Sequence, residues 1–131
     1  MLSCGKDWLD VNTDPNNPTR VNPENVFPAA VMSTATVVGG NYNILGGIWC
    51  QYYTQSNSAN QFKYIETYTL GNSDFQSQFN ELYSGALNDY KYVRKVATEQ
   101  KNWTYVYATT VMECYTYQML ADLYDQIPFN E

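Results

Sequence analysis

Apolar residues recur every three or four positions along most of the chain, which is the spacing of one face of an α-helix. This pattern predicts four helices, which we expect at residues 23–38, 43–54, 73–99 and 103–124. The segments between them are rich in glycine, asparagine, serine and glutamine, which are typical of turns and loops. The sequence therefore indicates an all-α fold.

The first predicted helix has clear signals at both of its ends. Asn22 is a favourable N-cap, and Pro23 takes the first helical position, where its missing N–H costs nothing. Pro28 lies inside the helical pattern, so we expect a kink or a restart of the helix there. The pair Gly39-Gly40 is expected to end the helix.

A long polar loop separates the second and third predicted helices. Gly46 and Gly47, in the second helix, suggest a close approach to another backbone. Residues 55–72 are expected to form the loop, with at most a short extended piece. Ser73, followed by Gln76 three residues later, is a capping-box pattern and predicts the start of the third helix.

The fourth predicted helix is apolar nearly all round and follows the third after a very short connection. Such a helix has to be covered on several sides, and alone it would expose a large apolar patch. We expect the last two helices to pack antiparallel as a tetratricopeptide-like pair, in a chain that forms the front of a larger protein. One stripe of the helix consists of Tyr107, Thr110, Val111, Cys114 and Gln118.

The composition narrows the chemistry that this chain can perform. It has no histidine, which removes the commonest general base, the commonest zinc ligand and any Ser-His or Cys-His pair. The formal net charge of −6 argues against nucleic-acid binding, which needs a basic surface. We therefore expect no enzyme activity, no cofactor and no bound metal. Of thirteen tyrosines, four are expected to pack in the helical core: Tyr83, Tyr90, Tyr107 and Tyr117.

The three cysteines fall into two groups. Cys50 and Cys114 lie in helical patterns and are expected to be buried free thiols, although a disulfide between them stays open in an exported protein. Cys4 follows a small residue with a leucine just upstream, which resembles the end of a bacterial lipoprotein signal. That pattern predicts a lipid anchor on Cys4; the alternative is an ordinary cysteine. We expect residues 1–22 to form an extended, proline-rich arm and residues 23–131 to form the helical part.

Four segments carry features of one protein family, in the order in which that family has them. They are Ser3-Cys4 with Lys6 to Asn12; Asn12 to Thr19; Trp49-x-Gln51-Tyr52 with Phe79-x-x-Leu82-Tyr83 and Asn88; and Ala121 to Phe129. Together they resemble the N-terminal part of SusD/RagB-type nutrient-binding outer-membrane lipoproteins of Bacteroidota. The second and fourth segments are the more specific, although this chain has Asp125-Gln126 where many relatives have Gly-Asp.

The resemblance implies a mostly α-helical, SusD-like lipoprotein on the cell surface, anchored in the outer membrane through Cys4. Such a protein caps a SusC-like TonB-dependent transporter and delivers an oligosaccharide or another neutral nutrient to it without catalysis. The residues themselves leave a different hypothesis open, a helical-repeat scaffold that binds proteins and no glycan. A glycoside hydrolase needs two carboxylates across one cleft, and the sequence does not locate such a pair.

Candidate ligand-binding residues lie in and beside the loop after the second helix. Glycan sites use flat aromatic faces against sugar rings, and planar polar groups for the hydroxyls. The loop offers both types, also in Gln55, Gln61 and Tyr68, and we select Trp49, Tyr53, Asn57, Asn60 and Tyr64 as candidates. The alternative is that Trp49 and Tyr52 pack in the core, as aromatic residues at helical spacing usually do, and that the loop is merely solvated.

Overall fold

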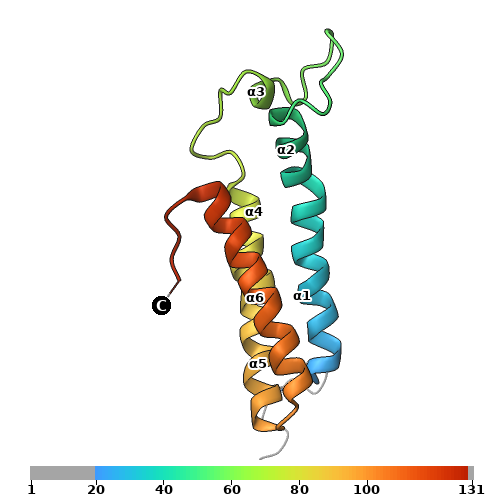
Figure 1. Ribbon diagram of the computed structural model, residues 1–131, viewed down its shortest axis with the longest axis vertical. Helices are drawn as coiled ribbons and strands as arrows, with labels where there is room; N and C mark the ends of the chain where they lie inside the picture. Colours follow the sequence, from blue (N-terminus) through green and yellow to red (C-terminus); the bar gives the residue numbers. More distant parts are fainter. Residues whose placement is uncertain (1–19, 130–131) are drawn as a thin grey trace, which may run out of the picture.

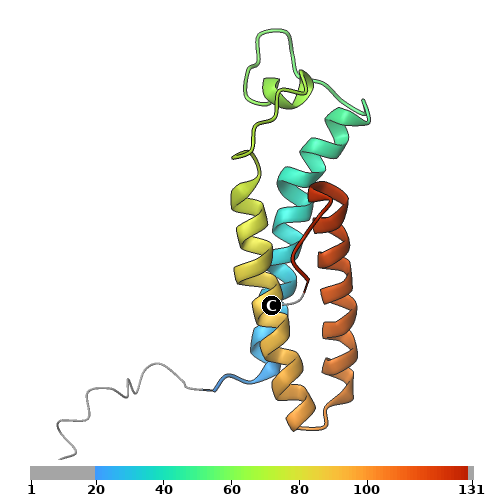
Figure 2. The same ribbon diagram turned by 90° about the vertical axis from the view of Figure 1, so that its left-hand side faces the viewer.

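The computed structural model describes residues 20–129, and within that range the chain is helical with no strand. Two π-helical segments, Val38–Tyr42 and Glu81–Leu87, extend the neighbouring helices, so that the helices form three long rods (Figures 1 and 2). The expected all-α fold is confirmed. The helices are α1 (Pro23–Val37), α2 (Asn43–Trp49), α3 (Lys63–Glu66), α4 (Gln76–Asn80), α5 (Asn88–Glu99) and α6 (Trp103–Tyr124).

The first rod begins at the predicted residue. Asn22 Oδ1 accepts a hydrogen bond from the Glu24 N–H (3.4 Å), and Pro23 is the first residue of α1. Pro28 lies inside α1 and the helix does not restart there. Because proline has no N–H, only the hydrogen bond to the carbonyl one turn earlier is lost at this position.

The Gly39-Gly40 pair interrupts the first helix, as predicted, but it does not end the rod: α1 stops at Val37 and the chain is kinked at Gly40. The helical path continues through Val38–Tyr42 into α2, with one local departure from helical geometry at Gly40 (φ −94°, ψ −106°). Beyond the glycines, Tyr42 and Leu45 are buried. Their packing explains the continuation, because tertiary contacts outweigh the low helix propensity of glycine.

The loop and the start of the second rod also differ from expectation. α2 ends at Trp49 rather than at residue 54, and the single turn α3 lies in the loop where no helix was expected. α4 begins at Gln76 after Phe75, which has left-handed backbone geometry (φ 62°), and no side chain caps this helix. The Ser73 capping-box prediction is therefore wrong.

The three rods run in alternating directions, so α5 and α6 are antiparallel, as expected (Figure 1). α6 has the predicted bounds at both ends. Each rod contributes side chains to one apolar core along the bundle axis. The buried members of this core are Ala30, Val37, Tyr42, Leu82, Ala86, Leu87, Tyr90 and Leu120.

A buried polar cluster ties the three rods together in the middle of that core. Thr34 of α1 hydrogen-bonds to the hydroxyl of Tyr90 of α5 (3.1 Å) and to the hydroxyl of Thr116 of α6 (3.3 Å). All three side chains are buried, and burial raises the pKa of Tyr90 above its ordinary value. Because a buried hydroxyl without a partner is costly, the cluster favours one register of the rods.

The side of α6 that faces the core is more polar than its sequence pattern suggests. Thr109, Glu113, Thr116 and Leu120 are buried, whereas Tyr107, Val111 and Cys114 of the predicted stripe are exposed. Glu113 can turn inward because its Oε2 pairs with Arg94 Nη1 at 3.0 Å. Burial still raises the pKa of Glu113, against the attraction of Arg94.

The core predictions for tyrosine and cysteine are therefore only partly right. Tyr90 is fully buried, and Tyr83 and Tyr117 pack partly buried against the core. Tyr107, in contrast, is 68% exposed. Cys50 and Cys114 are both exposed free thiols, so the expectation of burial is wrong and the possible disulfide does not form. Tyr107 and Cys114 are at positions of α6 that the other rods leave uncovered, and Cys50 follows the end of α2.

Candidate functional site

The candidate site lies at the end of the bundle that carries α2 and the long loop (Figure 1). Two of the five candidate residues, Trp49 and Tyr53, line hollows there. A second apolar cluster, made of Leu45, Ile48 and Ile65, supports this end of the molecule. The loop therefore rests on its own small core, separate from that of the bundle.

Trp49 is the centre of the site. Its indole N–H donates to the carbonyl of Ile65 (3.1 Å), and its ring stacks on Tyr68 at a centroid distance of 5.5 Å and an interplanar angle of 25°. Trp49 is nevertheless 38% exposed and Tyr68 is 63% exposed. The expectation that Trp49 packs in the core is thus only half right: the ring is held in place and keeps an open surface.

Two adjoining hollows share Trp49, and we call them together the Trp49 groove. One, of about 450 Å³, lies between α2, the end of the loop and the end of α6. The other, of about 660 Å³, lies between α2 and α6 and also includes Tyr53. The residues common to both are Tyr42, Leu45, Trp49, Asp122 and Leu123.

A third hollow is lined by Tyr68 and not by Trp49. It has a volume of about 620 Å³ and contains Tyr68 together with Tyr52, Tyr53 and Glu66. Tyr52 is 85% exposed, so the alternative that it packs in the core is wrong. The Trp49–Tyr68 stack therefore stands between open spaces rather than inside a closed core.

Tyr53 is positioned by the second of the two glycines in α2. Its hydroxyl donates to the carbonyl of Asn43 (2.9 Å), which lays the ring across the helix. A Cβ atom on Gly47 would overlap this ring, whereas one on Gly46 would meet nothing within 4 Å. The close approach that the glycine pair suggests is real at Gly47, but it is to a side chain and not to a backbone.

Polar groups stand at the rim of the groove. Asp74 accepts a hydrogen bond from the Gly71 N–H (2.6 Å), which closes a tight turn beside the hollow. Asp122, on the last turn of α6, lines both parts of the groove. These two carboxylates can accept hydrogen bonds from the hydroxyl groups of a bound molecule.

Two tyrosines join the end of α6 to the first rod beneath the groove. The hydroxyls of Tyr42 and Tyr124 hydrogen-bond to each other (3.1 Å), and Tyr124 also donates to the carbonyl of Phe75 (2.8 Å). Burial, together with the hydrogen bond to Tyr124, raises the pKa of Tyr42 far above its ordinary value. Both hydroxyls therefore stay neutral at physiological pH and hold the floor of the groove.

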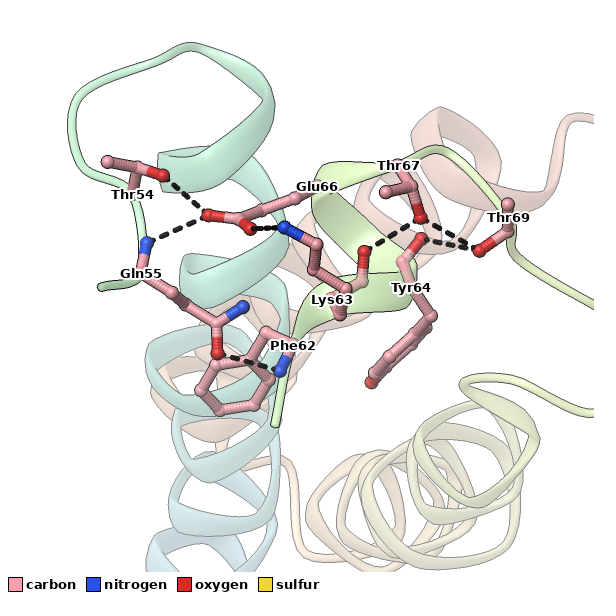
Figure 3. A network of polar contacts seen from close by, with 8 residues as sticks. All are labelled: Thr54, Gln55, Phe62, Lys63, Tyr64, Glu66, Thr67 and Thr69. Carbon is pink, nitrogen blue, oxygen red and sulfur yellow. Dashed lines mark hydrogen bonds and ion pairs between the residues drawn. The ribbon is translucent and has the colours of Figure 1, made fainter. Parts of the chain in front are cut away.

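The loop itself is held by a network around Glu66 (Figure 3). Glu66 Oε1 accepts hydrogen bonds from Thr54 Oγ1 (2.5 Å) and from the Gln55 N–H (2.8 Å), and these bonds lower the pKa of Glu66 to about 2. Lys63 Nζ lies 3.5 Å from Glu66 Oε2. Gln55 Oε1 in turn accepts from the Phe62 N–H (2.9 Å), which closes the loop on itself.

The remaining sequence candidates lie away from the groove. Asn57 and Asn60 are exposed on the far part of the loop, and neither lines any of the three hollows. Tyr64 packs partly buried against the small core under the loop. Cys4, the candidate lipidation site, lies outside the described residues.

The described part of the chain offers little for metal chemistry. Between residues 20 and 129, no three His, Cys, Asp or Glu side chains gather where they could hold a metal ion. None of the helices in this range has the length and hydropathy needed to cross a membrane.

Comparison with models of protein families gives no match for this sequence. Searches of curated proteins and of solved structures also give no match. The chemistry of the Trp49 groove is therefore the main structural guide to function.

Proposed function

We propose that this chain is a binding protein of the SusD/RagB type that holds an oligosaccharide in the Trp49 groove and performs no chemistry on it. The observation that carries the proposal is Trp49, which lines both parts of the groove, is anchored by its hydrogen bond to Ile65 and its stack on Tyr68, and yet keeps exposed aromatic surface. An aromatic surface of this kind can pack against the apolar face of a sugar ring, and pockets with a few fixed polar groups are typical of ligand sites.

The polar groups around the stack suit a sugar. Asp74 and Asp122 stand at the rim and accept hydrogen bonds, as sugar hydroxyls require. Trp49, Tyr53 and Leu123 of the groove are all exposed to solvent, which fits a chain of several sugars better than a small molecule that must be enclosed. The four family-like segments of the sequence support the same class of protein.

The rest of the proposed role follows from the resemblance. The protein would be anchored to the outer membrane by lipid on Cys4, exposed on the cell surface, and bound to a SusC-like TonB-dependent transporter that takes up the ligand. The antiparallel rods would then serve as the tetratricopeptide-like scaffold of a larger SusD-like domain. Incorporation of labelled palmitate, lost in Cys4→Ala, tests the anchor.

Calorimetric titration of the full chain with a panel of oligosaccharides tests the binding function. We expect saturable binding of at least one neutral oligosaccharide, and at least tenfold weaker binding after Trp49→Ala. Trp103→Ala is the matched control, because Trp103 is exposed to a similar degree at the opposite end of α6 and lines none of the three hollows. Failure of every oligosaccharide to bind would contradict the proposal.

A second candidate function, a scaffold that binds only proteins, is favoured by one observation. The outward side of α6 exposes Trp103, Tyr107 and Val111. If the chain is such a scaffold, it will bind a transporter barrel and ignore the sugar panel, and charge substitutions at Tyr107 and Val111 will abolish that binding.

A further inference from the structure

The charge around the Trp49 groove has one sign. The residues that line the three hollows include Asp74, Asp122 and Glu66, and no lysine or arginine. From Asn25 to Phe62, which includes all of α2, the chain has no charged residue at all. Among residues 20–129, those three carboxylates are thus the only charged groups that line the hollows.

The cation closest to these carboxylates in the sequence does not enter the groove. Lys63 lies on α3 and pairs with Glu66, and it lines none of the three hollows. Asp74 is bonded to a backbone N–H, which leaves its charge in place. Asp122 makes no hydrogen bond or ion pair with any described residue. Neither rim carboxylate is therefore paired with a cation of the described residues.

We propose that the Trp49 groove selects its oligosaccharide by charge, binding amine-bearing sugars more tightly than neutral ones and rejecting sugars that carry carboxylate or sulfate groups. This inference rests on the proposed function, because it concerns the ligand of the same site. Trp49 supplies contact with the sugar ring whatever the charge of the sugar, and the rim carboxylates supply the discrimination.

The expected size of this preference for amine-bearing sugars follows from elementary electrostatics. One ion pair at about 4 Å is worth roughly a fivefold change in affinity when it is fully exposed to water, and more when it is partly shielded. Two carboxylates at that distance would favour an ammonium group by about 25-fold, and because salt and longer distances reduce the attraction, we expect a preference of about tenfold over a neutral group. A sugar acid should be disfavoured by a similar factor, and both effects should shrink as salt is added.

Calorimetric titration of the full chain with tetramers of glucosamine, N-acetylglucosamine and galacturonic acid tests the inference. The glucosamine and N-acetylglucosamine tetramers share one β-1,4-linked backbone and differ in an amine against an acetamide, so this pair carries the test of positive charge. The galacturonic acid tetramer adds a negative charge and also differs in linkage and ring configuration. We expect affinity to fall in that order, by about tenfold at each step at low ionic strength. We also expect the difference between glucosamine and N-acetylglucosamine to shrink in the double variant Asp74→Asn, Asp122→Asn, which keeps the shape of both side chains.

Glu99→Gln is the matched control for the loss of charge. Glu99 pairs with Arg20 (2.8 Å) at the end of α5, far from the loop (Figure 1). Loss of its charge should therefore leave the order of the three affinities unchanged. Equal binding of the three tetramers, or the same order in the double variant, would overturn the inference and leave the binding function standing. Binding of none of them, with no effect of Trp49→Ala, would overturn both.

Discussion

Trp49 is held by contacts on one side and open on the other. The indole N–H is bonded to Ile65, and one face of the ring is stacked on Tyr68, so its orientation is fixed before any ligand arrives. A rigid aromatic side chain loses little conformational entropy on binding, which favours affinity. The neighbouring Tyr53 is fixed in a similar way, by its hydrogen bond to Asn43 and by the absence of a side chain on Gly47.

Gly47→Ala should displace the Tyr53 ring. The new methyl group would occupy the space of the ring, so we expect a loss of about 1–3 kcal/mol in the free energy of unfolding by urea. Gly46→Ala is the control one position away: nothing lies near its Cβ, and alanine should stabilise the helix by about 0.5–1 kcal/mol. Equal effects of the two substitutions would contradict the observed position of Tyr53.

Glu66 should give the loop a defined acid response. Its pKa in the folded protein is about 2, below its ordinary value of 4.5, so its contribution to stability is complete above pH 4.5 and is lost as pH falls toward 2. The Gln55 amide resonance, which reports the bond to Glu66, should titrate with a midpoint near 2. A midpoint near 4.5 would show that the hydrogen bonds to Glu66 are absent, and Glu66→Gln should remove the titration.

The sequence predicted part of the site, for identifiable reasons. Trp49 and Tyr53 could be chosen because they end or follow a helical pattern. Tyr68 was one of several loop tyrosines. It stacks on Trp49 from a left-handed backbone conformation (φ 55°), which the sequence does not predict. The contributions of Asp74 and Asp122 could not be seen, since the loop and α6 come together only in the folded chain.

At the scale of helices, the apolar periodicity within a helix predicted the structure better than the capping and glycine signals at its ends. α6 was predicted with its observed bounds, because its apolar pattern is long. Gly40 kinks the first rod but does not end it, because Tyr42 and Leu45 pack beyond it. The cap signal at Ser73 is wrong, because Phe75 has left-handed backbone geometry and α4 begins after it.

The inward face of α6 was misjudged because Thr116 and Glu113 turn inward toward partners on the other rods, Thr34 and Arg94. Thr109 is also buried on this face, without a hydrogen-bond partner.

The buried hydroxyl cluster should contribute strongly to the register of the three rods. Thr34→Val keeps the shape of the side chain but leaves Tyr90 without its partner, so we expect a loss of about 1–3 kcal/mol in urea unfolding. Thr36→Val, on an exposed side of α1 where the hydroxyl bonds only to the carbonyl of Met32, is the control and should change stability by less than about 0.5 kcal/mol. Similar losses in both variants would argue against the cluster.

At the scale of the whole molecule, one outward surface stands apart from the rest. Between Trp103 and Ala121 the single charged residue is Glu113, which is buried, so the exposed side of α6 is uncharged there. The bundle therefore has charged residues on α5, whereas the exposed side of α6 is uncharged and includes the apolar residues Trp103, Tyr107 and Val111. Such a surface is typical of a contact with another element or protein.

That surface predicts concentration-dependent association of the chain. The net charge of −6 repels copies from each other, so association should strengthen as salt screens the charge. The double variant Tyr107→Lys, Val111→Lys should remain monomeric in sedimentation velocity, whereas Thr36→Lys on α1 should associate like the original chain. A monomer at every protein and salt concentration would contradict this expectation.

The central claim is that an oligosaccharide lies against Trp49. The most direct test uses the variant Trp8→Phe, Trp103→Phe, in which Trp49 is the single tryptophan. Its fluorescence is recorded while a neutral oligosaccharide that binds by calorimetry is added. We predict a saturable blue shift of the Trp49 emission and reduced quenching by acrylamide. Both changes should have the same midpoint as the binding measured by calorimetry. Calorimetric binding that leaves the emission and quenching of Trp49 unchanged would contradict the claim.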